Sequence, residues 1–228
     1  MAARHLFPAV LLTGVFCLAG TGATSAQAVE PAASVSDSST MSSQVVLTIT
    51  DGSRPQFSVR LPRGWSVYDQ TLELTGKSGP SGMVIFSSVE VGKLTTDDFM
   101  KLMAQWDTGA VPAFFVDRGP AEKGTSCEGI SEKAQKKLLK MVESSSVGKG
   151  DKVTAPFQAE PVTLGTCSGV RVQGEVQKAS GDTWRFDVHA LSDGKTMYMF
   201  ALRNLKAQFE KNLAGYESAM ATVRLAGK

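Results

Sequence analysis

The stretch 183–202 constrains the fold of this chain more than any other part of the sequence. It reads TWRFDVHALSDGKTMYMFAL, two runs in which apolar and polar residues alternate, joined through Asp193-Gly194. Alternation with a period of two is typical of a β-strand with one buried face, and Asp-Gly between two such runs indicates a tight turn. We therefore expect a β-hairpin at the centre of an antiparallel sheet.

A two-residue turn at Asp193-Gly194 also predicts the register of this hairpin. One face would be apolar throughout, with three cross-strand pairs: Ala190 with Met197, Val188 with Met199, and Phe186 with Ala201. The other face would be half polar, with the pairs His189 with Tyr198, Asp187 with Phe200, and Arg185 with Leu202. We expect helices on the apolar face and partial cover on this mixed face.

Helices and short strands are predicted on both sides of the hairpin. The helices should begin at Thr95 or Thr96, at Ser131 and at Asn204, because each of these residues can cap a helix before an apolar stripe of helical spacing. We expect strands at 45–49, 57–61, near 67, at 72–74, 83–91 and 167–176. Prolines predict an irregular segment at 111–125 and an interrupted extended segment at 152–164.

The N-terminal sequence has the parts of a secretory signal. A basic start is followed by an apolar segment at 9–20 and by the small-residue cleavage site Ala26-Gln27-Ala28. The apolar segment is shorter than the roughly 20 residues that span a bilayer, so we expect no membrane span. We assign 1–28 to a signal peptide, 29–43 to a disordered leader rich in Ser and Ala, and 44–228 to a single domain. The protein is expected to be periplasmic or secreted.

Three cysteines are present, and one of them lies in the signal segment. Phe16 precedes Cys17, where a lipoprotein signal has a small residue, so lipidation is not expected. The remaining pair, Cys127 and Cys167, favours a disulfide over two free thiols in an oxidising compartment.

The charge balance is close to neutral. The chain has 24 Lys and Arg against 22 Asp and Glu, and loss of Arg4 with the signal leaves a net charge of +1. This balance does not favour nucleic-acid binding. The lysines of 133–140 are read as a solvated helix face, with contact to an anionic membrane or an acidic partner as the alternative.

Few residues in the sequence are candidates for chemistry. A metal site needs several convergent ligands, and His189, Cys127 and Cys167 are the only soft candidates, so no metal or cofactor is expected. A Ser-His-Asp hydrolase would have to use His189 with Asp187 or Asp193, but no Gly-x-Ser-x-Gly turn is present. We favour a hydrogen-bonded sheet histidine, and keep a hydrolase using His189 as the alternative.

Several short sequence motifs resemble those of the PsbP/Mog-like superfamily, which includes DcrB-like bacterial exported proteins. They are VRLPRGW at 59–65, the strand containing Gly169, VHA at 188–190 before DGK at 193–195, Tyr198, and the amphipathic helix at the C-terminus. The resemblance implies an α+β fold with a central antiparallel β-sheet flanked by helices, an α/β/α sandwich. It also implies an accessory or binding role without conserved enzymatic chemistry.

The sequence thus predicts an exported, non-catalytic accessory or binding protein. Its partner would be another envelope protein or a small ligand. The mixed face of the hairpin is the predicted binding surface, with Arg185, His189 and Tyr198 as candidate contacts.

Overall fold

A computed structural model describes residues 45–51, 54–61, 64–69, 81–89 and 95–225. The predicted signal peptide, the leader and the strand at 72–74 lie outside these ranges. Among the helices in these ranges, none combines the length and the hydrophobicity that a membrane span requires.

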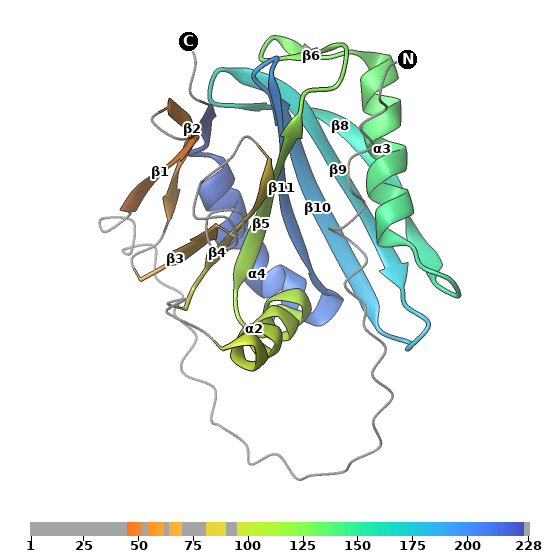
Figure 1. Ribbon diagram of the computed structural model, residues 1–228. Coiled ribbons are helices and arrows are strands. Elements are labelled where there is room, and N and C mark those ends of the chain that lie inside the picture. Colours follow the sequence, from red (N-terminus) through yellow and green to blue (C-terminus); the bar gives the residue numbers. More distant parts are fainter. Residues whose placement is uncertain (1–44, 52–53, 62–63, 70–80, 90–94, 226–228) are drawn as a thin grey trace, which may run out of the picture.

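The main sheet has seven antiparallel strands in the order β3-β4-β5-β11-β10-β9-β8 (Figure 1). Their bounds are β3 Ser66–Asp69, β4 Gly82–Ser87, β5 Ala113–Pro120, β8 Lys152–Leu164, β9 Cys167–Gln177, β10 Thr183–Ser192 and β11 Thr196–Leu205. The hairpin β10-β11 therefore lies inside the sheet, as predicted. A smaller sheet pairs β1 Val45–Asp51 and β12 Arg224–Leu225 with β2 Arg54–Leu61, and β6 Thr125–Ser126 pairs with β7 Gly129–Ile130.

Helices cover the main sheet on both faces, which confirms the predicted α+β fold with a flanked antiparallel sheet. Helices α2 Thr96–Thr108 and α3 Glu132–Ser146 lie on one face, where the partly buried Ala201 of β11 packs against the apolar clusters of both. Helix α4 Lys206–Met220 and the smaller sheet cover the other face (Figure 1). The largest apolar cluster lies there and includes Phe57, Phe114, Phe200 and Phe209.

The register of the hairpin differs from the prediction by two residues. Ser192 pairs with Met197, Ala190 with Met199 and Val188 with Ala201. The turn lies one residue later than expected, since Gly194 takes a φ of +90° and Asp193 Oδ1 accepts hydrogen bonds from the backbone N–H groups of Lys195 and Thr196. A shift of two residues leaves every side chain on its predicted face.

The segment predicted to be irregular contains a central strand. Strand β5, Ala113–Pro120, pairs with β4 on one side and β11 on the other. Its consecutive apolar residues face opposite sides of the sheet, so Phe114 packs toward α4 and Phe115 toward α2. The prolines that suggested a break stand only at its boundaries, where a strand tolerates them.

The extended segment with two prolines is also a strand. Strand β8 forms one edge of the sheet and runs from Lys152 to Leu164, with irregular pairing between Val153 and Gln158. Pro156 and Pro161 are compatible with this place, because an edge strand has backbone positions without a ladder partner. Prolines and bulges at an edge also oppose pairing with a further strand.

The predicted disulfide is present. Cys127, between β6 and β7, is bonded to Cys167 at the start of β9. The backbone N–H of Ser168 donates to the Cys127 carbonyl at 2.8 Å, so the two segments are joined by a backbone hydrogen bond as well. The bond ties the chain just before α3 to the β8-β9 turn.

Candidate functional site

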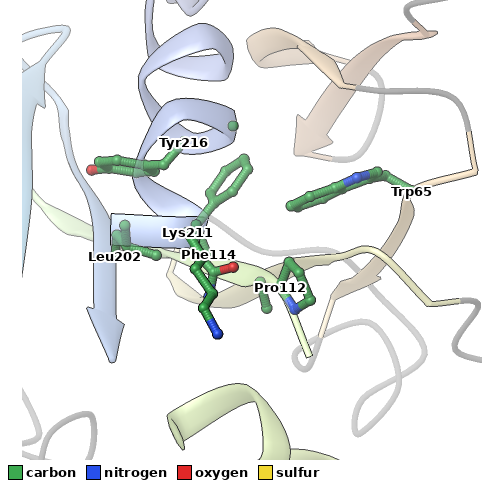
Figure 2. Close-up of a pocket in the computed structure, with 9 residues that line it drawn as sticks. Trp65, Pro112, Phe114, Leu202, Lys211 and Tyr216 are labelled. Carbon is green, nitrogen blue, oxygen red and sulfur yellow. The ribbon is translucent and has the colours of Figure 1, made fainter. Parts of the chain in front are cut away.

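A pocket opens between helix α4, the start of β5 and the segment after β2. Its volume is about 180 Å³. Figure 2 shows the rings of Trp65, Phe114 and Tyr216 around it, with Pro112 and Leu202 nearby. We call this hollow the Trp65 pocket.

Aromatic rings form the walls of the Trp65 pocket. The ring centroids of Trp65 and Phe114 are 5.9 Å apart, and those of Phe114 and Tyr216 are 5.7 Å apart. Phe114 also stacks on Phe86 at 4.8 Å. These contacts give the pocket a fixed apolar wall, because each ring is held by a second ring behind or beside it.

Gly215 of α4 leaves space at this pocket. A Cβ atom added to it would meet no heavy atom within 4 Å outside its own helix turn and chain neighbours. The position therefore has room for a side chain, although glycine inside a helix is less stable than alanine by roughly 0.5–1 kcal/mol. Glycine therefore leaves space beside the pocket and lowers the stability of the helix.

Two polar residues of α4 border the pocket. The amide nitrogen of Asn212 donates to the Gly109 carbonyl at 3.1 Å and to Asn204 Oδ1 at 3.0 Å, which ties α4 to the end of α2. Lys211 is exposed, and no described residue forms an ion pair or hydrogen bond with its ammonium group. Its positive charge is thus available to contact a ligand beside an otherwise apolar hollow.

Asn204 has a different role from the predicted helix cap. It lies on β11, fully buried, and α4 begins two residues later, with Leu205 at the cap position. Its side chain donates to the Trp106 carbonyl at 3.2 Å and accepts from Asn212. The predicted caps Thr95 and Ser131 do stand before their helices, and Thr95 Oγ1 accepts from the Asp98 backbone N–H.

His189 of the predicted binding surface lies beneath α4. It is 4% exposed, and its Nδ1 lies 2.9 Å from the hydroxyl of Tyr216. That hydroxyl donates to the Phe200 carbonyl at 2.8 Å, which leaves it free to accept the proton of Nδ1–H. Burial lowers the pKa of His189 to about 4, and the attraction of Asp187 opposes this only in part.

The carboxylate beside His189 is paired with another group. Asp187 is fully buried and accepts two hydrogen bonds from the Arg171 Nε–H, at 3.0 and 3.1 Å, a further bond from Arg171 Nη2 and one from Gln173 at 2.9 Å. The hydrogen bonds from Arg171 to Asp187 and the charge of Asp187 raise the pKa of Arg171. Asp187 therefore serves as the counter-charge of Arg171 under the edge of α4.

The other two predicted contacts have different surroundings. Tyr198 is 1% exposed; its hydroxyl donates to Asp193 Oδ2 at 3.2 Å, and burial raises its pKa. Arg185 is partly exposed, lies over the ring of Phe209 and forms ion pairs with Glu210 and Glu175. The three residues thus do not share one open surface, and their binding role stays a prediction.

Arg185 borders a second hollow, which lies over β8, β9 and β10. Its volume is about 260 Å³, and its lining includes Gln158, Glu160, Gln173 and Glu175. This is the part of the mixed face where polar side chains reach solvent beside α4. Helix α4 covers part of the mixed face, as expected.

The surroundings of His189 do not resemble a catalytic triad. Its described partners are Tyr216 and Asp187, and no serine, threonine or cysteine among the described residues is hydrogen-bonded to it. No group of three or more His, Cys, Asp or Glu side chains converges as metal ligands within the same ranges. The arrangement can orient α4 on the sheet, but it offers no activated nucleophile.

The residues of the Trp65 pocket were not predicted as a site. In the sequence, Trp65 was noted only as part of the VRLPRGW motif, and Tyr216 only as part of the amphipathic helix at the C-terminus. One usable signal was present: Gly215 lies inside the predicted helix, and a glycine inside a helical pattern indicates a special packing position.

Comparisons with known proteins give likenesses of fold. No family model and no curated protein matches the sequence. Among solved structures, cyanobacterial PsbP (CyanoP) from Synechocystis is 13% identical, with a TM-score of 0.46, and the match covers 83% of this chain and 96% of that chain. LpqN, involved in cell envelope biogenesis of Mycobacterium tuberculosis, is 12% identical, with a TM-score of 0.44 and coverage of 81% and 91%.

A third structure, from Bacteroides thetaiotaomicron, is 15% identical with a TM-score of 0.41. That match covers 76% of this chain and 46% of the other, so this chain spans about half the length of that protein. One of these neighbours is a PsbP protein, and the likeness concerns the fold alone.

Proposed function

We propose that this chain is an exported, non-catalytic binding protein that holds a small apolar molecule, or the apolar end of a larger one, in the Trp65 pocket. The observation that carries the proposal is the open position at Gly215 beside the aromatic wall. A helix glycine with room for a side chain, next to an apolar hollow, is explained by a ligand that occupies the hollow.

The size and lining of the pocket suit such a ligand. An apolar cavity of about 150 Å³ is enough to hold benzene, and the Trp65 pocket has about 180 Å³. Small-molecule sites are mostly apolar and carry a few polar groups that fix orientation. Lys211 and Asn212 supply such groups at this pocket.

The disulfide supports export, because such bonds persist in oxidising compartments. We place the protein in the periplasm or outside the cell, with another envelope protein as a further possible partner at the polar hollow near Arg185. Crosslinking of the protein in its own cells tests this placement. Recovery of only cytosolic partners would contradict it.

The alternative, a hydrolase using His189, gains no support from the buried contacts of that residue. A screen of ester and amide substrates, followed by the His189→Ala variant, tests this reading. Hydrolysis that depends on His189 would overturn the non-catalytic proposal.

Titration with toluene and with hexanol tests the proposed site. We expect the indole N–H signal of Trp65 to shift in NMR spectra, while the signals of Trp106 and Trp184, which lie away from the pocket, stay in place. Gly215→Leu should fill the pocket and weaken binding by at least about tenfold, which is roughly 1.4 kcal/mol.

The matched control is Ala214→Leu, which adds the same side chain to an exposed neighbouring position of α4. It should leave binding unchanged. Equal effects of the two substitutions, or no shift at Trp65 with either probe, would refute the proposed site.

A further inference from the structure

Two methionines flank an aspartate across three neighbouring strands. Asp117 of β5 is directly opposite Met83 of β4 and directly opposite Met199 of β11. Residues opposite one another in an antiparallel sheet project from the same face, with Cβ atoms roughly 4.5–5.5 Å apart. The two thioethers and the carboxylate therefore stand side by side in one row.

This row lies on the face of the sheet that carries α2 and α3. The neighbouring row, Ile85 and Phe115, is buried under α2. Figure 1 shows α2 across one end of β5 and α3 over β8 and β9, with the other part of β5 and β11 between the two helices. Met83 is 7% exposed, whereas Asp117 and Met199 are partly exposed, so solvent reaches the row from one side.

Asp117 has no side-chain partner among the residues that the structure describes. Among the described residues, no side chain donates a hydrogen bond to its carboxyl group or forms an ion pair with it. Burial raises the pKa of Asp117 to about 7, and the backbone N–H and charge of Arg118 oppose this only in part. A cation bound at this carboxyl group would favour its charged form and offset the cost of burying that charge.

The next polar residue on the same strand is arranged differently. Arg118 projects from the opposite face, and its guanidinium donates to Gln56 Oε1 at 3.1 Å. Methionine alone needs no special explanation, because its flexible side chain fills irregular gaps in a core. An unpaired carboxylate between two methionines is not explained by gap filling.

The chemistry of these three groups selects one class of ligand. Thioether sulfur is a soft ligand that favours Cu(I), whereas Ca²⁺ takes six to eight oxygen ligands, far more than this row provides. One carboxylate neutralises one monovalent cation, so no net charge would remain in a half-buried place. We propose that Met83, Asp117 and Met199 form a binding site for a soft monovalent cation of the Cu(I) class.

Silver ion is the probe, because it has the same charge and softness as Cu(I) and is stable in air. The purified, oxidised protein carries ¹³C-labelled methionine methyl groups and is titrated with silver nitrate in chloride-free buffer. We expect the Met83 and Met199 methyl signals to shift together and to saturate at one equivalent. Absence of these shifts, or shifts confined to other methionines, would overturn the site.

Variants separate this site from adventitious binding. Met83→Leu and Met199→Leu keep side-chain volume nearly constant, so we expect folded protein with at least about tenfold weaker silver binding. Asp117→Asn should also weaken binding. The matched control is Met100→Leu on α2, where the methionine is 54% exposed and lies outside the row; it should bind silver as the parent does.

Equal affinity in Met83→Leu, Met199→Leu and the control would contradict the proposal. If a variant fails to fold, the methyl shifts of the parent protein still decide the question.

Discussion

Gly215 shows how a single missing side chain relates the fold to the proposed function. It lies in α4, and a Cβ atom at this position would meet no heavy atom within 4 Å outside its own helix turn and chain neighbours. Stability alone would favour alanine there, because alanine has the highest helix propensity. At this position alanine would make the helix more stable, whereas glycine leaves more space at the pocket.

Gly215→Ala should raise the free energy of unfolding by roughly 0.5–1 kcal/mol, since the methyl group meets no obstacle and the unfolded chain loses freedom. Denaturant titration followed by circular dichroism measures the change. The reverse substitution at the exposed neighbour, Ala214→Gly, should lower the free energy of unfolding by a similar amount. A destabilised Gly215→Ala variant would mean that neighbouring atoms lie too close to this position for a methyl group.

His189 predicts a pH dependence of stability. Its folded pKa of about 4 is below the ordinary value of 6.5, so the unfolded state binds a proton more readily. The stability that neutral His189 provides is complete above pH 6.5 and is lost as the pH falls toward 4. The change is roughly 1 kcal/mol for each pH unit in this window.

Thermal or denaturant unfolding of the parent and of His189→Gln between pH 7 and pH 4 tests this dependence. The parent should lose stability relative to the variant as the pH falls, because glutamine does not titrate. Parallel curves would show that burial does not hold the histidine neutral.

Side-chain environments were the part of the site that sequence reasoning predicted least well. His189 was expected to be hydrogen-bonded, but the residue that meets it, Tyr216, is 27 positions away on α4. Asn204 looked like a helix cap because its type and position fit one, yet its partners are Trp106 and Asn212. Such contacts depend on how distant segments pack, which local patterns do not determine.

At the scale of elements, α4 decides how much of the mixed face is open. It covers the large apolar cluster of β5 and β11 with Phe209, Tyr216 and Met220, and leaves polar residues of β8 and β9 outside its edge. The same helix supplies Lys211, Asn212 and Gly215 to the Trp65 pocket.

Ending the chain after Leu205 should therefore abolish soluble folding, because removal of α4 uncovers Phe114, Phe200 and Leu202 together. Ending it after Leu225, beyond the last described strand, is the matched control and should give a folded protein. Yield in the soluble fraction and the cooperativity of thermal unfolding measure both. A cooperative transition in the shorter chain would show that α4 is not needed for the core.

Strand faces were easier to predict than strand boundaries. The predicted face of each hairpin residue was correct, although the cross-strand pairing is shifted by two residues. Burial determines the face that a residue occupies, whereas the turn determines which residues pair. Strand β5 was missed because both faces of this central strand are largely buried, so its sequence shows no alternation, and its flanking prolines looked like breaks. The role of Thr95 as a helix cap was predictable, because a cap contacts only residues a few positions further along the chain.

For the whole molecule, the disulfide joins parts that sheet pairing alone would leave separate. It closes a loop with a sequence separation of 40, and this loop contains β7, α3 and β8. The two cysteines outside the signal segment and the expected oxidising compartment were enough to predict this bond, because neither argument depends on geometry. The layered arrangement was predictable from alternation and helical stripes, whereas the hollows between layers were not.

Reduction of Cys127–Cys167 should lower the free energy of unfolding by roughly 4 kcal/mol, the loop-entropy value for a loop of this length. Denaturant titration with and without reductant measures the loss. A Cys127→Ala, Cys167→Ala double variant should be less stable than the oxidised parent and insensitive to reductant. Equal stability of oxidised and reduced protein would contradict a stabilising role for the bond.

The claim that the Trp65 pocket binds an apolar group is tested most directly by intermolecular nuclear Overhauser effects with bound toluene. The account predicts contacts from the toluene methyl group to ring protons of Trp65, Phe114 and Tyr216, and their loss in Gly215→Leu. Contacts to another part of the protein, or contacts that persist in Gly215→Leu, would contradict it.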